Sequence, residues 1–193
     1  MSRHQAFFVR LVRIIAVLGA GSLLAACSTM DYAGRDRSQL DSLAWNSPTT
    51  RQTVAWDGRE KPGTIVIATK DRTLYLVQPD HTAIQYMVGV GRPGFQWAGV
   101  KSITRKEIWA DWTPPPQMHQ RQHGLPVHMA GGIENPLGAR SLYLGSSLYR
   151  IHGASDPNTI GQEVSSGCIR MNNADVMDLY ERVHVGTPVI VRL

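Results

Sequence analysis

The pattern of hydrophobic and polar residues changes near residue 63. After that point, short apolar runs rich in β-branched residues alternate with turn residues such as Asp, Gly and Pro. Six such runs are visible, at residues 64–68, 73–77, 83–90, 141–144, 148–152 and 188–193. Runs this short, separated by short turns, predict a mainly β domain, with the first three strands forming an antiparallel meander.

One helix is predicted near the C-terminus. Its apolar residues follow the spacing i, i+3, i+4, i+7 and are Val176, Leu179, Tyr180 and Val183. Asn172 or Asn173 can cap its first turn, and Asp175 suits the positive end of the helix dipole. Gly186 and Pro188 end the helix before the last strand.

Two stretches rich in proline and glycine interrupt the β pattern. Residues 113–116 read Thr-Pro-Pro-Pro, and residues 124–138 contain several Gly and Pro. Neither stretch can form a regular helix. We therefore expect long loops over one face of a sheet, with the segment from about Trp112 to Gly138 covering a cleft.

The first 62 residues differ from the rest. A basic stretch ending at Arg13 precedes thirteen mostly apolar residues, 14–26, as in a secretory signal. This run reaches about 20 Å as a helix, whereas the hydrocarbon core is ~30 Å thick, so a permanent transmembrane helix fits less well. Residues 28–62 are polar without a sustained period, which predicts a linker with at most a short ordered stretch near Trp45 or Trp56. The predicted division is a signal peptide (1–26), a linker (27–62) and a folded domain (63–193).

The leader ends in Leu24-Ala25-Ala26-Cys27, which resembles the lipobox of bacterial lipoproteins. In those proteins the cysteine is diacylated and becomes the new N-terminus, and several acyl chains hold a protein firmly in a membrane. Ser28, rather than Asp, follows the cysteine, which favours the outer over the inner membrane of an enteric-type cell. The expectation is a periplasmic, lipid-anchored protein. The alternative is an ordinary signal peptide cleaved near Ala26.

Composition and charge narrow the choice of partners. The chain of 193 residues is 42% hydrophobic and 18% charged, which is typical of one globular domain. Its formal charge is +5, but three of its 20 basic residues lie in the leader, which has no acidic residue. The remainder carries 17 basic against 15 acidic residues, so charge gives no reason to expect a nucleic-acid partner. Two cysteines exclude a disulfide-rich scaffold and any zinc site with more than two sulfur ligands.

Cys168 is the candidate nucleophile. If Cys27 is lipidated, Cys168 has no partner in the chain, and an unpaired thiol outside the cytoplasm is either buried and inert or kept for its reactivity. The sequence Val-Ser-Ser-Gly-Cys-Ile-Arg around it, residues 164–170, is small and polar, as a nucleophile approached by a substrate backbone requires. The nearby helix start and Arg170 should lower the pKa of the thiol. The backbone N–H groups of Cys168 and Gly167 could donate to an oxyanion.

Two histidines compete for the role of base, since His152 lies sixteen residues before Cys168 and His184 sixteen residues after it. Context favours His152, because it ends an apolar strand and is followed by Gly153, which leaves open space beside the ring. His184 lies where the helix stops and can simply interact with the last carbonyl groups. The other candidates, His119, His123 and His128, lie among Pro and Gly. No helix is expected there, so a metal pair of His119 and His123 is not favoured, and no metal site is predicted.

These residues together resemble a known family. Ile151-His152-Gly153, followed by Ser165-Ser166-Gly167-Cys168-Ile169-Arg170-Met171, is similar to the signature of the YkuD-type L,D-transpeptidases. Residues 112–115 (Trp-Thr-Pro-Pro) and 135–138 (Asn-Pro-Leu-Gly) also match, and the resemblance covers about residues 63–193. One departure is Ser166, where many members have a histidine. That histidine is not the family's base, so the change affects only the expected wall of the pocket.

The resemblance implies a fold and a reaction. The fold would be a β-sandwich of mixed sheets with one main helix after the catalytic loop. Cys168 would attack a peptidoglycan tetrapeptide stem between the diamino acid at position three and the terminal D-Ala, and His152, oriented by a carbonyl near Gly153, would carry the proton. Ser165, Ser166 and Arg170 would contact the substrate, although Arg170 could instead order the loop or pair with an Asp of the following helix. The acyl acceptor would be the amine of another stem or of a wall-attached protein, with no cofactor.

Two alternative functions stay open from the sequence. The first is a papain-like, NlpC-type wall peptidase that uses His184 as its base, and the second is a non-catalytic wall-binding lipoprotein. The aromatic residues near the expected cleft do not decide between them. Trp97, Trp109 and Trp112 could line a substrate groove, but an aromatic residue beside a strand is more often part of the core.

Overall fold

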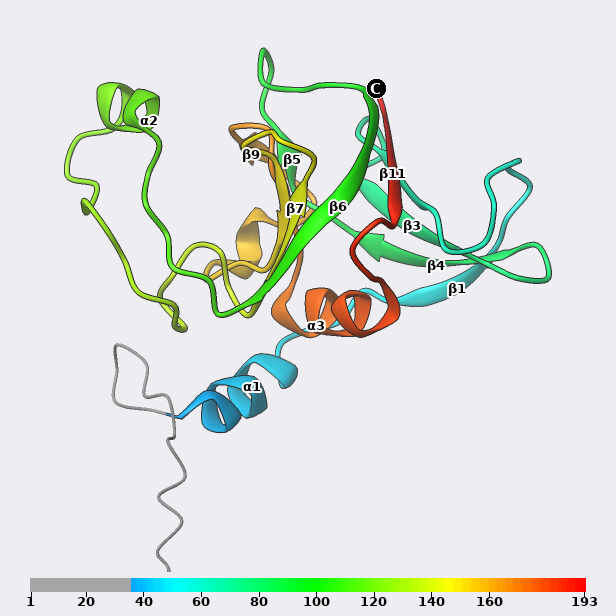
Figure 1. Ribbon diagram of the computed structural model, residues 1–193, viewed down its shortest axis with the longest axis horizontal. Helices are drawn as coiled ribbons and strands as arrows, with labels where there is room; N and C mark the ends of the chain where they lie inside the picture. The colour runs from blue at the N-terminus through cyan, green and yellow to red at the C-terminus, as the bar shows by residue number, and fades with distance from the viewer. Residues whose placement is uncertain (1–35) are drawn as a thin grey trace, which may run out of the picture.

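The computed structural model describes residues 36–193, drawn in colour in Figure 1. The predictions of a signal peptide and of a lipidated Cys27 lie outside the described residues. Within the described part, none of the helices combines the length and the apolar character that a membrane span requires.

The strands and helices follow each other as a β-rich chain with few helices. The strands are β1 (Gln52–Ala55), β2 (Ile65–Ala68), β3 (Thr73–Gln78), β4 (Thr82–Met87), β5 (Val90–Gly91), β6 (Gly99–Ile108), β7 (Arg140–Leu144), β8 (Arg150–His152), β9 (Glu163–Ser165), β10 (Ile169–Arg170) and β11 (Pro188–Arg192). The helices are α1 (Arg37–Trp45), α2 (Pro116–Arg121) and α3 (Asn173–Arg182), with a 3₁₀ turn at Pro157–Thr159.

Nine strands form one mixed sheet in the order β1-β4-β3-β2-β11-β6-β7-β8-β10, and β5 pairs with β9 beside it. Strand β11 lies parallel to β2, and β10 lies parallel to β8, while the other neighbours in the large sheet are antiparallel. The long strand β6 pairs with β11 through residues 99–102 and with β7 through residues 103–108. It therefore belongs to both halves of the curled sheet (Figure 1). The predicted fold class, mainly β with mixed strand directions, is confirmed.

The core lies between the two halves of the sheet and α3. Buried side chains from β2, β3, β7 and β8 share one cluster with α3, among them Ile65, Ile67, Leu74, Leu142, Leu144 and Ile151. Val176, Leu179 and Val183 of the C-terminal segment join this cluster, and Tyr180 packs against it. The helical spacing in the sequence therefore predicted both the helix and its buried face.

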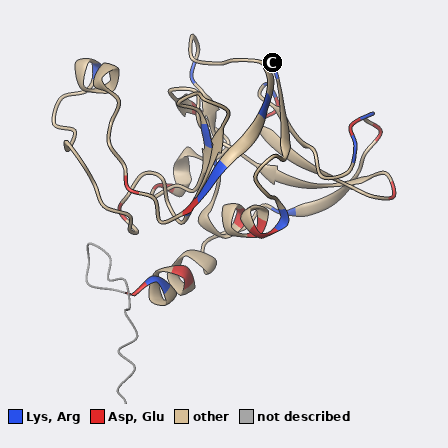
Figure 2. Ribbon diagram, viewed as in Figure 1, with Lys and Arg blue, Asp and Glu red and all other residues tan. Residues whose placement is uncertain are grey.

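Part of the predicted linker, residues 27–62, is ordered in the structure, including the stretches near Trp45 and Trp56 where the sequence allowed some order. Helix α1 and strand β1 occupy this stretch, and β1 pairs antiparallel with β4. Helix α1 has no periodic apolar pattern because it buries only Leu40 and Ala44, and its residue Asp41 bonds to Trp109 and Arg140. Figure 2 shows charges of both signs on α1 and α3. Asp41 of α1 forms a bidentate ion pair with the buried Arg140, in which the two guanidinium nitrogens lie 2.8 and 2.9 Å from the two carboxylate oxygens.

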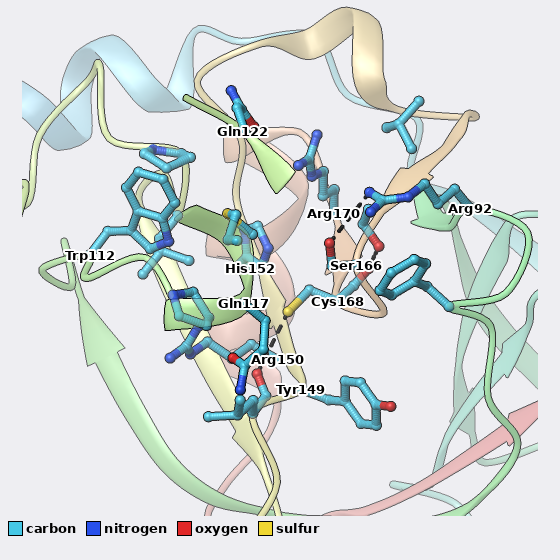
Figure 3. Close-up of a pocket in the computed structure, with 18 of the residues that line it drawn as sticks. Arg92, Trp112, Gln117, Gln122, Tyr149, Arg150, His152, Ser166, Cys168 and Arg170 are labelled. Atoms are coloured by element: carbon cyan, nitrogen blue, oxygen red, sulfur yellow. Dashed lines mark hydrogen bonds between the residues drawn. The ribbon is translucent and has the colours of Figure 1, made fainter. Parts of the chain in front are cut away.

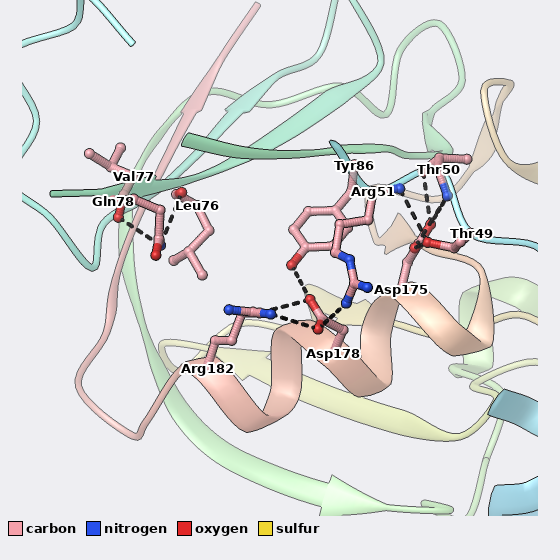
Figure 4. Close-up of polar contacts among 10 residues, drawn as sticks. All are labelled: Thr49, Thr50, Arg51, Leu76, Val77, Gln78, Tyr86, Asp175, Asp178 and Arg182. Carbon is pink, nitrogen blue, oxygen red and sulfur yellow. Dashed lines mark hydrogen bonds and ion pairs between the residues drawn. The ribbon is translucent and has the colours of Figure 1, made fainter. Parts of the chain in front are cut away.

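Asp175, in the first turn of α3, binds residues 49 and 50 of the N-terminal segment through hydrogen bonds (Figure 4). Its carboxylate is fully buried and accepts hydrogen bonds from the Thr49 hydroxyl at 2.5 Å and from the N–H and hydroxyl of Thr50 at 3.0 and 2.8 Å. The N–H of Ala174 donates to the Ser47 hydroxyl at 2.7 Å. The predicted capping by Asn172 or Asn173 is therefore corrected, because the N-terminal segment provides the acceptor and no side-chain capping bond comes from Asn172.

Asp178, one turn further along α3, forms a second attachment (Figure 4). It accepts hydrogen bonds from the Tyr86 hydroxyl at 2.6 Å and from Arg182 Nε at 2.8 Å, and it pairs with Arg51. Burial alone would raise the pKa of Asp178, but the hydrogen bonds from Arg182 and Tyr86 lower it. Burial and the neighbouring carboxylate raise the pKa of Tyr86 well above its usual range.

The buried carboxylate of Asp175 predicts a large effect on stability. Replacing it by alanine should lower the free energy of unfolding by about 3 kcal/mol, because the donors of Thr49 and Thr50 lose their acceptor. Urea unfolding followed by tryptophan fluorescence measures the change. Glu181→Ala removes an exposed carboxylate from the same helix and should change the stability by less than about 0.5 kcal/mol. Equal losses in the two variants would contradict this role of Asp175.

Candidate active site

A cleft of about 910 Å³ contains both Cys168 and His152 (Figure 3). Its walls come from separate parts of the chain, namely the turn after β5, helix α2 with its flanking loops, strand β8 and the loop between β9 and β10. The cleft therefore exists only in the folded chain.

The parallel pairing of β8 with β10 brings the two sequence motifs together. Ile169 lies opposite Ile151 and Arg170 opposite His152, and the N–H of Met171 donates to the His152 carbonyl at 2.8 Å. Cys168 is the residue before β10 and so lies at the level of Arg150, the first residue of β8. Two residues separated by sixteen positions in the sequence therefore face one cleft.

His152 is held as a neutral, oriented imidazole. Its ring is almost completely buried, and Nδ1 donates to the Gly153 carbonyl at 2.6 Å, which leaves the lone pair on Nε2. This is the orientation that the family resemblance implies. Burial lowers the pKa of His152 to about 3, and the positive charge of Arg170 contributes to the lowering.

Asn173 holds the segment that carries His152, a contact that sequence reasoning missed. Its Oδ1 accepts a hydrogen bond from the Ala139 N–H at 2.9 Å, and its Nδ2 donates to the Ala154 carbonyl at 3.1 Å. A Cβ on Gly153 would lie 2.2 Å from this Oδ1. Gly153 is therefore required for close approach as well as for its carbonyl, and the contact between Gly153 and Asn173 links the His152 segment to the start of α3.

The thiol of Cys168 lies between backbone groups of the segment that leads into β8. Its sulfur is 3.7 Å from the Leu148 carbonyl oxygen, and the backbone N–H of Arg150 points to the sulfur. Burial raises the pKa of the thiol, and this effect exceeds the opposing effects of the Arg150 N–H and of the charges on Arg150 and Arg170. The prediction of a lowered thiol pKa is therefore wrong in direction for the unliganded site.

The loop before Cys168 is fixed by its own hydrogen bonds. The Ser165 hydroxyl donates to the Cys168 carbonyl at 2.6 Å and accepts from the Gly167 N–H at 3.0 Å. Trp97 Nε1 donates to the Gly167 carbonyl at 2.8 Å and stacks on Tyr149 with a ring separation of 4.6 Å. Ser165 lines the cleft and also shapes the loop. The expectation for Gly167 is corrected, because its N–H is already bonded to the Ser165 hydroxyl rather than free for an oxyanion.

Gly167 allows this loop to form. Its φ is +106°, a conformation that side chains disfavour, and a Cβ there would lie 2.5 Å from the Tyr149 ring. The sequence predicted small residues around the sulfur, and Gly167 is one of them. The structure adds that the glycine allows the ring of Tyr149 to pack against the backbone of the loop.

Arg170 and Ser166 both line the cleft. The alternative of an ion pair between Arg170 and an Asp of α3 is excluded within the described residues, because Asp175 is bound by Thr49 and Thr50, and Asp178 by other groups. Ser166 Oγ lies 3.4 Å from a guanidinium nitrogen of Arg92 and accepts its hydrogen bond.

The remaining candidates divide between the cleft and other parts of the structure. His184 is exposed, lies outside the cleft and has Nδ1 2.9 Å from the Val185 carbonyl oxygen, so it is not placed to serve Cys168. His119 lies in α2, where no helix was expected; Pro116 begins this short helix, because proline is tolerated in a first turn.

Trp112 lines the cleft, and Trp109 is buried in a second core cluster. Among residues 36–193, no three His, Cys, Asp or Glu side chains are grouped to hold a metal ion.

Comparison with known proteins agrees with this geometry. The family model for the L,D-transpeptidase catalytic domain (YkuD) matches residues 62–191. The chain belongs to this family. The matched region includes the whole of the β8 to β10 segment and the cleft built around it.

Three relatives show how far the likeness extends. The probable L,D-transpeptidase ErfK/SrfK of Escherichia coli is 35% identical over 134 residues, which is 65% of this chain and 42% of that protein. A Brucella melitensis protein described as a probable carnitine operon oxidoreductase is 42% identical, with a TM-score of 0.50, covering 79% of this chain and 99% of that one. An L,D-transpeptidase of Mycobacterium smegmatis shares the fold at 20% identity and a TM-score of 0.52, over 67% of this chain and 58% of that one. The L,D-transpeptidase domain seen here thus spans less than half the length of the E. coli relative.

The low pKa of His152 predicts a specific dependence of stability on pH. Between pH 6.5 and 5 the unfolded chain binds a proton at this histidine while the folded chain, with its pKa of about 3, does not. The free energy of unfolding should therefore fall by about 1 to 2 kcal/mol more in the wild type than in His152→Gln over this interval. Urea unfolding at each pH measures the difference. His184→Gln, which removes an exposed histidine, should keep the wild-type slope, and a wild-type slope in His152→Gln would contradict the low pKa.

Proposed function

We propose that this protein is a peptidoglycan L,D-transpeptidase that uses Cys168 as nucleophile and His152 as base. The observation that carries the proposal is the meeting of these two side chains in one cleft through the pairing of β8 with β10. Membership of the L,D-transpeptidase family supports it. The substrate is a tetrapeptide stem, cut between the diamino acid at position three and the terminal D-Ala.

The reaction consists of two acyl transfers. The thiol proton of Cys168 moves to Nε2 of His152 as the sulfur attacks the carbonyl carbon, and the negative charge collects on the carbonyl oxygen. Collapse of this intermediate breaks the amide bond, and His152 returns the proton to the departing amine of D-Ala. The acceptor amine then attacks the thioester, gives a proton to His152 and restores the thiol. The thioester conserves enough reactivity for the second transfer, so the chemistry needs no cofactor.

Cys168 and His152 are both neutral before substrate binds, so the thiol is activated only during the reaction. Burial raises the pKa of Cys168 and lowers that of His152, so thiol and imidazole are both uncharged before substrate binds. A neutral imidazole with its lone pair on Nε2 is the form that can accept the thiol proton. The thiolate forms together with attack, and a protonated thiol reacts more slowly with oxidants than a thiolate does.

The acceptor is an amine, either on a neighbouring stem, which yields a 3-3 cross-link, or on a lysine of a wall-attached protein. The NlpC-type alternative is not favoured, because its histidine would be His184, outside the cleft. The non-catalytic alternative predicts wall binding without any muropeptide product.

A carbapenem tests the nucleophile and the base. We expect intact-protein mass spectrometry to show one covalent adduct, located on Cys168 by peptide mapping, and no adduct on Cys168→Ala. His152→Gln should slow both acylation and the release of D-Ala from tetrapeptide stems by at least about 100-fold, since proton transfer by a positioned group contributes ~10²–10⁴. His184→Gln should retain wild-type rates. An adduct on Cys168→Ala, or a loss of activity only in His184→Gln, would refute the proposal.

The protein's location is a second part of the proposal. Cys27, at the end of the lipobox-like sequence, carries the lipid, and the protein is periplasmic and held preferentially at the outer membrane. Because α1 begins at Arg37 with Asp36 as its cap, the chain between Cys27 and Asp36 spans at most about 32 Å. The domain then works close to the membrane, rather than at the end of a tether of some 35 residues.

Fractionation of cells tests this anchoring. The wild type and Cys168→Ala should sediment with the outer membrane, because both keep Cys27. Cys27→Ala should appear in the soluble periplasmic fraction, and metabolic labelling with a fatty acid should mark only the proteins that retain Cys27. Membrane attachment and labelling that persist in Cys27→Ala would contradict the lipid anchor.

A further inference from the structure

The cleft around Cys168 is lined by basic but no acidic side chains among the described residues. Four of its lining residues are arginines, Arg92, Arg121, Arg150 and Arg170, and none of the described residues that line it is Asp or Glu. No carboxylate among residues 36–193 lies within 4 Å of these four guanidinium groups, whereas Arg51, Arg140 and Arg182 elsewhere are all paired. Unpaired cations in a concave site attract anionic ligands.

Two of these arginines share one aromatic ring. The guanidinium carbon of Arg92 lies 4.1 Å from the centroid of Phe95, and that of Arg121 lies 5.1 Å from the same centroid. The ring stabilises each cation, but the two like charges repel each other. A bound anion removes this repulsion and supplies an acceptor for both groups. We call these three residues the Phe95 site.

The Phe95 site is built on the catalytic loop. The N–H of Arg92 donates to the Ser165 carbonyl at 3.0 Å, and a side-chain nitrogen of Arg92 donates to the Ser166 hydroxyl at 3.4 Å (Figure 3). The N–H of Phe95 closes a turn by donating to the Arg92 carbonyl at 2.8 Å. Arg92 therefore donates its hydrogen bond to Ser166, the position at which many family members have histidine.

The second arginine comes from the opposite wall. Arg121 ends α2, which carries basic but no acidic colour in Figure 2, and α2 belongs to the segment that covers the cleft. The other two arginines have different surroundings. Arg150 is directed to the Tyr143 ring at 4.9 Å, and Arg170 is partly buried beside His152. The Phe95 site is therefore distinct from the groups closest to the sulfur.

We propose that the Phe95 site binds a free carboxylate of the stem peptide upstream of the scissile bond, and that the enzyme selects stems with this carboxylate over stems in which it is a carboxamide. The inference rests on the proposed function, because it concerns the substrate of the same cleft. A carboxylate accepts hydrogen bonds on both oxygens and can bridge two guanidinium groups. A carboxamide has the same shape but no charge, and its NH₂ group would face donors.

Binding of two matched peptides to Cys168→Ala, which cannot be acylated at this position, tests the proposal. One peptide is a tetrapeptide stem with all carboxylates free, and the other differs only by a carboxamide at the side-chain carboxyl upstream of the scissile bond. Calorimetry should give about tenfold tighter binding of the free carboxylate, as expected for a charge-assisted hydrogen bond in a partly exposed site. The preference should decrease as the salt concentration rises.

Substitutions in the Cys168→Ala background locate the source of the preference. Arg92→Gln and Arg121→Gln should each weaken binding of the free carboxylate about three- to tenfold and leave binding of the carboxamide nearly unchanged. Arg92→Lys keeps the charge and should restore part of the preference. The matched control is Arg105→Gln, because Arg105 also stacks on an aromatic ring, Tyr143 at 3.7 Å, but lies outside the cleft and pairs with Glu107.

The outcomes separate this inference from the proposed function. Equal binding of the two peptides, or a preference that survives Arg92→Gln and Arg121→Gln, would overturn the carboxylate site while carbapenem acylation of Cys168 still supported the enzyme. Absence of binding of both peptides, with no release of D-Ala by the wild type, would overturn both. A lost preference in Arg105→Gln would show that surface charge in general, rather than the Phe95 site, produces the effect and would overturn the inference.

Discussion

The parallel pairing of β8 with β10 is the contact on which the arrangement of the cleft depends. Strand β8 is held on its other side by β7 and contributes Ile151 to the main core, so its position is fixed by burial. Strand β10 takes its register from β8, which sets Cys168 relative to His152. The hydrogen bonds of Ser165 and the packing of Gly167 on Tyr149 then fix the loop that presents the sulfur.

The buried polar contacts of α3 extend this constraint to the N-terminal segment. Asn173, at the start of α3, is hydrogen-bonded beside the glycine that follows His152, while Asp175 and Asp178 bind the segment from Thr49 to Arg51. Removing one partner of a buried polar group costs more than the intact pair contributes, so these contacts favour one arrangement over others. The segment that leads from the proposed membrane anchor is thus joined to the helix that follows the nucleophile.

The arginines of the cleft combine two electrostatic effects. Together with burial, which is the larger cause, the charges of Arg170 and Arg150 keep the His152 imidazole neutral, and the positive charge of the cleft favours ligands that carry carboxylates. Burial has opposite consequences for the two proposed catalytic groups, because it disfavours the charged form of each. A neutral pair surrounded by fixed positive charge is consistent with chemistry that begins only when an anionic substrate fills the cleft.

The features that depend on local pattern could be predicted from the amino-acid sequence. The β-rich class, the strands of the meander, helix α3 with its buried face and the neighbourhoods of Cys168 and His152 all follow from periodicity, turn residues and motif composition. Tertiary structure decided the features that depend on distant contacts. Strand β6 has few apolar residues and is defined by β11 and β7, and α1 and β1 are held by polar partners far along the chain. The direction of the Cys168 pKa shift, the role of Asn173 and the meeting of Arg92 with Arg121 also required the fold, because burial and electrostatic interaction depend on distances in space that sequence spacing does not contain.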